Sequence, residues 1–116
     1  MATQTRTADE RKMDRIASLR FVRDDATEAA YYGAIINNPK TTQYLREASE
    51  AIRELNRLGV REDLPAGKFT VYYSQHDMGS DDGRMVRPNK LHAAQSMWLM
   101  RQCGYGAVTC EESTNN

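Results

Sequence analysis

The sequence of 116 residues predicts a small α+β domain, in which three N-terminal helices precede a strand–loop–helix–strand unit with a sheet of two to three strands. This prediction rests on two changes in the spacing of the apolar residues along the sequence. Apolar residues recur every three to four positions up to Gly59, as in helices, and then alternate at every second position in KFTVYYSQ, as in a half-buried strand. The helical period returns in KLHAAQSMWLMRQC, before a short β-branched stretch at 106–110.

The first helix is expected to begin near Ala8, because helical spacing starts there. Its apolar stripe is of the kind that faces a core. The members of the stripe are Met13, Ile16, Ala17, Leu19 and Phe21.

Asp24 and Asp25 predict an interruption of this helix. The stretch from Asp25 to Glu28 has the Asp-x-x-Glu form of a capping box, in which side chains satisfy the unpaired N–H groups of a helix start. A second helix would then run over residues 26–36.

Residues 26–36 are apolar on nearly every side. A helix of this kind is either central in a core or covered by another chain. Tyr31 and Tyr32 are therefore candidate partner-binding residues, since a tyrosine combines a large apolar ring with a hydroxyl that needs a partner. A homodimer is one arrangement that would cover them.

The third helix has the clearest period, in TTQYLREASEAIRELNRLG. Asn38 is suited to cap its start and Pro39 to occupy its first turn, while Gly59 is suited to follow its end. The apolar seam lasts for fewer than three heptads, so it predicts packing inside the domain rather than a coiled coil.

The strand at 68–74 leaves two pairings open. It could pair in parallel with 106–110 through the intervening helix, as a right-handed crossover. Alternatively it could form an antiparallel hairpin with a short strand at 84–87, and 106–110 would join an edge.

The length and composition of the chain predict one domain over residues 1–116, with flexible tails at 1–7 and 111–116. No apolar run approaches the length that spans a bilayer, and the polar start MATQTRTADERK lacks a signal-peptide core, so a cytoplasmic location without membrane contact is expected. Cys103 and Cys110 are then expected to be reduced thiols.

The loop HDMGSDDG raises the possibility of a metal-dependent enzyme that uses His76, Asp77, Asp81 and Asp82. The spacing does not match a calcium loop, because the positions that need glycine and glutamate hold Asp82 and Pro88. Gly, Ser and Asp are also the ordinary residues of a hairpin tip, so a solvated turn is the preferred interpretation.

The charges are balanced overall, with 16 basic and 16 acidic residues, but they are unevenly distributed. No acidic residue occurs from Arg84 to Thr109. The cations of this stretch are candidate contacts either to phosphate or to an acidic protein surface. The cations assigned to partner binding are Arg84, Arg87, Lys90 and Arg101.

The sequence shows no phosphate-binding glycine motif, nucleophile elbow or cofactor fingerprint, so no catalytic, metal or cofactor site is assigned. The preferred hypothesis is a small non-catalytic protein that docks on a protein partner, in the manner of a regulator or inhibitor carried by a phage or another mobile element. A nucleic-acid-binding regulator that uses the basic stretch 84–101 is the first alternative, and the metal-dependent enzyme is the second.

Overall fold

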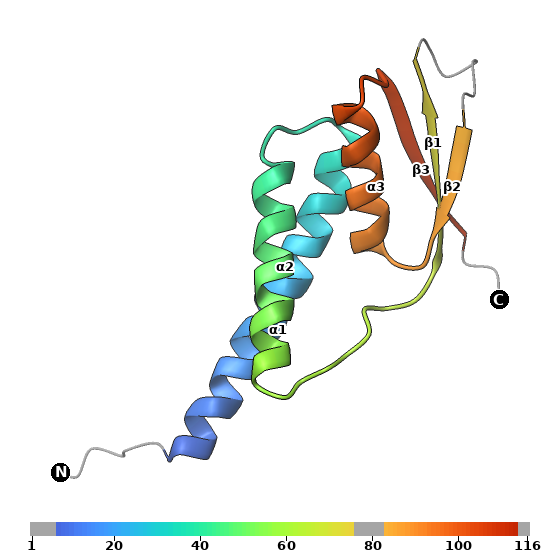
Figure 1. Ribbon diagram of the computed structural model, residues 1–116. Helices are drawn as coiled ribbons and strands as arrows, with labels where there is room; N and C mark the ends of the chain where they lie inside the picture. The colour runs from blue at the N-terminus through green and yellow to red at the C-terminus, as the bar shows by residue number, and fades with distance from the viewer. Residues whose placement is uncertain (1–6, 76–82, 114–116) are drawn as a thin grey trace.

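The computed structural model describes residues 7–75 and 83–113, and it has the predicted α+β composition (Figure 1). Two helices rather than three precede the first strand. The elements in chain order are α1 (Ala8–Ile35), α2 (Thr41–Arg57), β1 (Lys68–Ser74), β2 (Gly83–Arg87), α3 (Lys90–Gln102) and β3 (Ala107–Ser113).

The predicted break at Asp24 and Asp25 is wrong, because α1 is one continuous helix of 28 residues. Both aspartates lie on its solvent side and leave the helical backbone undisturbed. Asp24 accepts a hydrogen bond from the Arg23 guanidinium at 2.8 Å, and the Thr27 hydroxyl donates to the Arg23 carbonyl. A capping box has no function here, since the N–H groups that it would satisfy already bond within the helix.

All three helices end in the same way, with one residue in the left-handed region. Gly59 after α2 and Gly104 after α3 have φ of 86° and 101°, and Asn37 after α1 has φ of 58°. In each case the next residue donates its N–H back across the last turn, for example Val60 to the Leu55 carbonyl at 2.9 Å. The predicted role of Gly59 is therefore confirmed. The Asn38 side chain accepts from the Lys40 N–H, although the regular helix begins only at Thr41.

The three-stranded sheet has the order β2-β1-β3, and both pairings are antiparallel. The hairpin alternative for 68–74 with 84–87 is confirmed, and the parallel crossover is wrong. Residues 111–113 are not part of a tail, because β3 continues to pair with β1 as far as Ser113, which lies opposite Lys68. The N-terminal helix begins close to the predicted boundary, with Thr7 as its cap.

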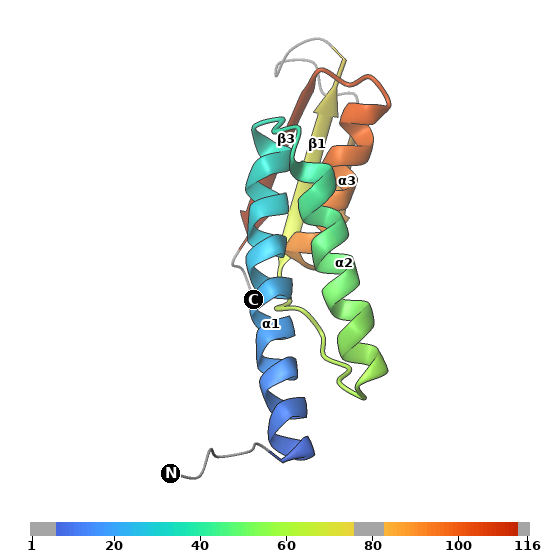
Figure 2. The same cartoon turned by 90° about the vertical axis from the view of Figure 1, so that its left-hand side faces the viewer.

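The molecule has three layers, with the sheet on one side, α3 and the second half of α1 in the middle, and α2 on the other side (Figures 1 and 2). The covered face of the sheet contributes Phe69, Val71 and Val108 to the main core. The middle layer contributes mostly small residues, which let the helices approach closely. They are Ala30, Ala34, Ala93 and Ala94, together with Tyr31 and Met97.

The predicted core stripe of α1 is only partly correct. Leu19 is buried and Ile16 is half-buried against the end of α2. Met13 and Phe21 are 70% and 71% exposed. In Figure 1 the start of α1 projects past the end of α2, and α2 packs only on the side of this half that holds Ile16 and Leu19, which leaves Met13 and Phe21 in solvent.

A clamp holds the segment between α2 and β1 against α1. The Arg20 guanidinium donates to both carboxylate oxygens of Glu62, at 3.0 and 2.8 Å, and Arg23 adds a third bond at 2.9 Å. These contacts hold the pKa of Glu62 below its usual range. Leu64 follows and packs on a small cluster that includes Leu91 of α3, so the segment is fixed at two points.

Candidate docking site

Three of the six predicted site residues come together beside the second half of α1. Tyr31 is buried in the core, whereas Tyr32 is 55% exposed. Their rings meet edge to face with centroids 5.1 Å apart. The Lys90 ammonium lies 5.5 Å from the centroid of Tyr31 and 5.6 Å from that of Tyr32, so the α3 start supplies a cation to the aromatic pair.

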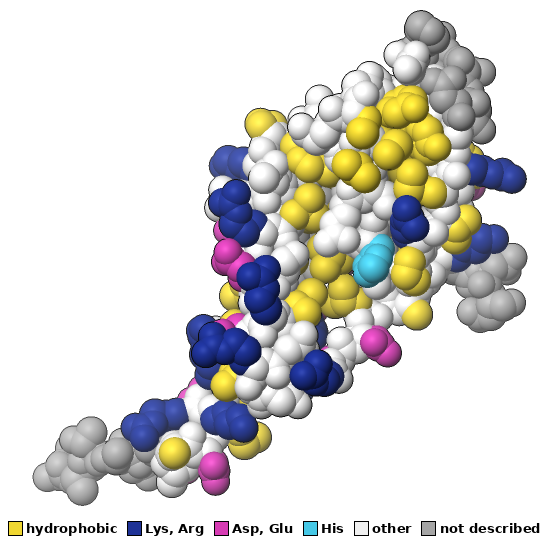
Figure 3. Space-filling view, viewed as in Figure 1, with side chains coloured by type: hydrophobic (Ala, Val, Ile, Leu, Met, Phe, Trp, Pro, Cys, Tyr) yellow, Lys and Arg dark blue, Asp and Glu magenta, His cyan; other side chains and the backbone are white. Residues whose placement is uncertain are grey.

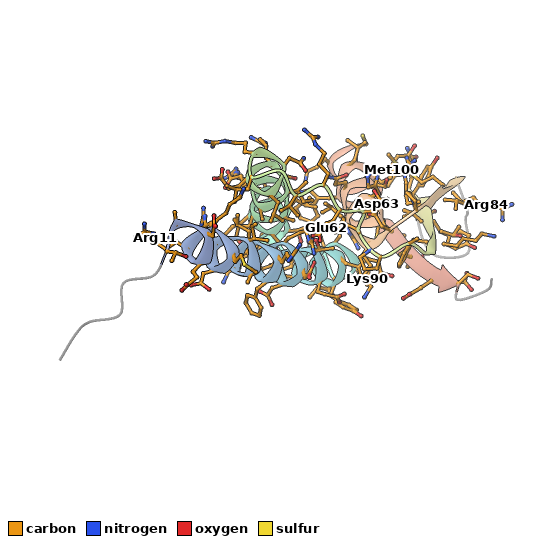
Figure 4. All side chains as sticks on the ribbon, turned by 90° about the horizontal axis from the view of Figure 1, so that it is seen from below. Arg11, Glu62, Asp63, Arg84, Lys90 and Met100 are labelled. Atoms are coloured by element: carbon orange, nitrogen blue, oxygen red, sulfur yellow. The ribbon has the colours of Figure 1, made fainter. Side chains whose placement is uncertain are left out.

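Lys90 is also ion-paired with Glu28 of α1, with 2.6 Å between Nζ and Oε1. This hydrogen bond to a carboxylate raises the pKa of Lys90, and partial burial opposes the rise only in part. Asn89 caps α3 by accepting from the His92 N–H at 2.9 Å, which places Lys90 at the first position of the helix. Figure 4 shows Lys90 beside the second half of α1, whereas Arg84 lies farther out, at the sheet.

A cavity of about 260 Å³ opens next to this cluster. Its walls come from α1, from the segment 64–66, from α3 and from the sheet. Its apolar part is formed by Leu64, Pro65, Ala66 and Phe69, and its polar part by Asp24, Thr27, Glu28, Lys90 and Glu112. Three carboxylates and one ammonium therefore line the cavity, and its lining has a negative excess.

Tyr31 forms the buried side of the site. Burial and a hydrogen bond to the Cys110 side chain raise the pKa of the Tyr31 hydroxyl above its ordinary range. Burial also raises the pKa of the Cys110 thiol, so both groups are neutral partners in the core at neutral pH. Tyr31 therefore supports the site from behind, and Tyr32 is the tyrosine that another molecule can reach.

Arg101 has a structural role. Its guanidinium donates to the carbonyls of Ala34 and Ile35 at 2.9 and 2.8 Å, and to the carbonyl of Val108 at 3.3 Å. It thus satisfies the last carbonyls of α1 and ties them to β3. Burial lowers the pKa of Arg101 from its ordinary value, but an arginine stays charged at neutral pH.

Arg87 and Arg84 occupy opposite faces of β2. The Arg87 guanidinium donates to the Ser96 hydroxyl at 2.6 Å and contacts the Met85 sulfur, so it joins β2 to α3. Arg84 is exposed on the uncovered face, opposite Tyr72. Across residues 7–75 and 83–113, it is the predicted cation for which no intramolecular hydrogen bond or ion pair is found. The basic stretch therefore does not form one patch of free cations.

The loop residues His76, Asp77, Asp81 and Asp82 lie outside the described part of the chain. Within the described part, no group of three or more His, Cys, Asp or Glu side chains could hold a metal ion. Cys103 and Cys110 are free thiols, on the surface and half-buried respectively.

A second hollow of about 570 Å³ lies between α1 and α2. Its charged lining is balanced, with three arginines and three glutamates, and Arg57 is already paired with Glu54 at 3.0 Å. This balance gives the hollow no preference for a cationic or an anionic ligand.

Two further apolar side chains are useful for comparison with the site. Figure 3 shows hydrophobic side chains gathered over the C-terminal half of α3, and Leu99 of that helix is 57% exposed. Val86 is exposed on the uncovered face of the sheet. Neither residue lines the cavity beside Tyr32.

Sequence reasoning missed the carboxylates of the site. Asp24, Glu28 and Tyr32 are spaced by four residues, and this spacing alone would have placed two acids and the exposed tyrosine on one row of α1. The ion pair of Glu28 with Lys90 and the approach of Glu112 join residues that are far apart in sequence, so no local pattern signals them.

No protein-family model, curated protein or solved structure matches the chain. Among the described helices, none is both long enough and apolar enough to cross a membrane.

Proposed function

We propose that this chain is a non-catalytic binding protein that docks on a protein partner at the cavity beside Tyr32. The partner presents an arginine or lysine side chain next to apolar residues. The observation that carries the proposal is the exposed Tyr32 ring, whose centroid is 5.6 Å from the Lys90 ammonium, next to a cavity that Lys90 lines together with three carboxylates.

The charges of the cavity favour a cation. Lys90 is neutralised by Glu28 at 2.6 Å, and Asp24 is paired with Arg23 at 2.8 Å. Glu112 remains, a carboxylate for which the described residues provide no ion pair. Its charge favours an incoming guanidinium or ammonium and repels phosphate, which argues for a protein partner over a nucleic acid at this site.

The apolar walls fit the rest of such a side chain. Long basic residues bury their methylene stems against apolar surface while the charged head reaches a polar partner. Leu64, Pro65 and Phe69 provide that surface. Outside the cavity, Tyr32 is followed one turn later by Ile36, which is 72% exposed, and tyrosine is among the residues that most often dominate binding energy.

The functional groups of the site support binding rather than catalysis. The one hydroxyl among the residues that line the cavity belongs to Thr27, and it donates to the Arg23 carbonyl at 2.7 Å. A small protein with such a site would act as a regulator or inhibitor by occupying a basic segment of its target. The nucleic-acid alternative would rest mainly on Arg84, since the other three predicted cations are engaged within the chain.

Selection of binders from a random dodecapeptide library displayed on phage tests the proposal. We expect enrichment of arginine or lysine beside aliphatic or aromatic residues. Binding of a selected peptide should weaken at least tenfold in Glu112→Lys and in Tyr32→Ala.

Glu111→Lys is the matched control, because it makes the same change of charge one residue away, on the opposite face of β3. It should leave binding within about twofold. Equal weakening by Glu111→Lys and Glu112→Lys would show unspecific attraction and contradict the site, as would selected peptides without cations.

A further inference from the structure

We propose that Lys90 occupies the place that the partner's basic side chain takes, so that the partner binds by displacing it. The inference rests on the function proposed above, and it names the residue that limits the affinity of that site. Lys90 is then a resident cation supplied by the fold itself, and Glu28 is a second binding carboxylate that Lys90 masks.

Lys90 already makes the contacts that the site offers to a basic side chain. Its ammonium lies 5.5 and 5.6 Å from the ring centroids of Tyr31 and Tyr32, and its Nζ is 2.6 Å from Oε1 of Glu28. The hydrogen bond to Glu28 raises the pKa of Lys90, and the charge of Glu112 acts in the same direction. Aromatic rings with carboxylates beside them are an environment that binds a lysine or arginine head group.

The stability of α3 does not explain a lysine at this position. Lys90 is the first residue of α3, where the helix dipole disfavours a cation, and the first turn of the helix contains no acidic residue. The lysine is held instead from α1, by Glu28. Its side chain is 26% exposed, whereas that of Glu28 is 51% exposed. An incoming cation can therefore reach the Glu28 carboxylate while Lys90 is still bound to it.

Lys90 is the single basic side chain among the described residues that line the cavity. Its departure moves one positive charge from the lining into solvent, and leaves both Glu28 and Glu112 to the cation that enters. Because one cation replaces another, the net gain from charge is small in the unchanged chain. The presence of Lys90 therefore weakens the binding of every cationic ligand at this place.

Neutralising Lys90 should strengthen the binding of a cation, and NMR titration of the full chain with N-acetyl-arginine amide measures it. Lys90→Met should bind this probe about fivefold more tightly than the unchanged chain, or better, because Glu28 is released. Adding Glu28→Gln to Lys90→Met should abolish the gain. N-acetyl-citrulline amide, a neutral probe of similar shape, should gain nothing from Lys90→Met.

Lys12→Met is the matched control for the change in net charge. Lys12 is exposed in the first half of α1 and does not line the cavity, so its removal should leave binding of the arginine probe within about twofold. The proposal is overturned if Lys90→Met gives no gain, or if Lys12→Met gives the same gain. A gain that survives Glu28→Gln, or that extends to the citrulline probe, overturns it as well.

The side-chain signals of Lys90 test the displacement directly. In the unchanged chain the ε-methylene protons lie next to the ammonium that faces the two tyrosine rings, so they should differ in chemical shift from those of the exposed Lys12. Saturation with the arginine probe should move them to the Lys12 values. Signals that stay in place while the probe saturates the site would show that the cation binds beside Lys90, and would overturn the proposal.

These measurements need no protein partner, so they separate the role of Lys90 from the proposed function. Tighter binding of the arginine probe by Lys90→Met supports the role of Lys90 even if the selected peptides carry no cations, a result that would contradict only the proposed partner. Conversely, a selected basic peptide that depends on Glu112 but binds Lys90→Met no better than the unchanged chain would contradict the role of Lys90 alone.

Discussion

The two halves of α1 look alike in sequence and differ in structure. Both carry apolar residues at helical spacing. In the second half, Ala30, Tyr31 and Ala34 are buried beneath α3 and the sheet, whereas in the first half Met13 and Phe21 remain in solvent. The difference comes from the neighbouring elements, because α2 ends near Ile16 and Leu19 and the sheet does not reach this far (Figure 1).

The comparison shows that an apolar stripe on a helix predicts that something packs on it. The stripe does not tell whether another element of the same chain does so. Small residues are typical of the half that is covered by the chain itself, since they allow close helix packing. Large residues on the outer side of the other half leave apolar surface that no described part of the chain covers.

The largest expected effect is on the free energy of unfolding, and it distinguishes a substitution in the second half of α1 from one in the first half. Tyr31→Ala should lower the free energy of unfolding by about 3–5 kcal/mol, because it removes a buried aromatic ring. Phe21→Ala should change it by no more than about 0.5 kcal/mol, because the ring is exposed. Denaturant titration measures both. Similar losses in the two variants would show that the halves are equally packed.

A smaller effect on stability is expected where Gly33 of α1 lies against Thr41 of α2. A Cβ atom at Gly33 would lie 2.6 Å from the Thr41 Oγ1, and that hydroxyl is held by its bond to the Asn38 carbonyl. Gly33→Ala should therefore cost about 1–3 kcal/mol by overpacking, although alanine favours helices. In the double variant with Thr41→Ala the two costs should be less than additive. A gain of stability from Gly33→Ala alone would contradict the close approach.

Glu62 bonds Arg20 and Arg23 near the middle of α1, and these bonds predict that the stability of the fold depends on pH. Its folded pKa is lowered by Arg20 and Arg23, so its contribution is present above the ordinary value of 4.5 and is lost as the pH falls through the folded pKa. Thermal unfolding between about pH 6 and pH 3 should show a steeper loss for the unchanged chain than for Glu62→Gln. Parallel curves would mean that the clamp does not contribute to stability.

The smallest expected effect belongs to Lys90. Its pKa is raised by Glu28, so the contribution is present below the ordinary value of 10.5 and is lost as the pH rises through the folded pKa. The ion pair is partly exposed, and Lys90→Met should cost about 0.2–1 kcal/mol at pH 7. The difference between the two proteins should shrink above about pH 11. An unchanged difference would assign the cost to lost packing instead.

Local signals predicted much of the fold correctly. The period of two at 68–74, the helix end at Gly59 and the hairpin alternative for 84–87 all depend on residues close in sequence, and the structure confirms them. The break at Asp24 and Asp25 was wrong because acidic residues on a solvent face do not end a helix that is held by packing on either side of them.

The site was predicted less well than the fold. Tyr32 and Lys90 were both predicted as partner-binding residues and lie together in the structure. The bonds that occupy Arg87 and Arg101 were not predicted, because they depend on α3 packing against β2 and on the end of α1 meeting β3. Such contacts are set by tertiary structure, and a run of cations in the sequence cannot reveal which of them are engaged.

The absence of a break in α1 has a geometric consequence for binding. At a rise of about 1.5 Å per residue, the ring of Tyr32 is held roughly 22 Å along the helix from Ala17. A molecule that binds beside Tyr32 and a molecule that covers the exposed first half of α1 would therefore meet surfaces whose separation the helix keeps constant.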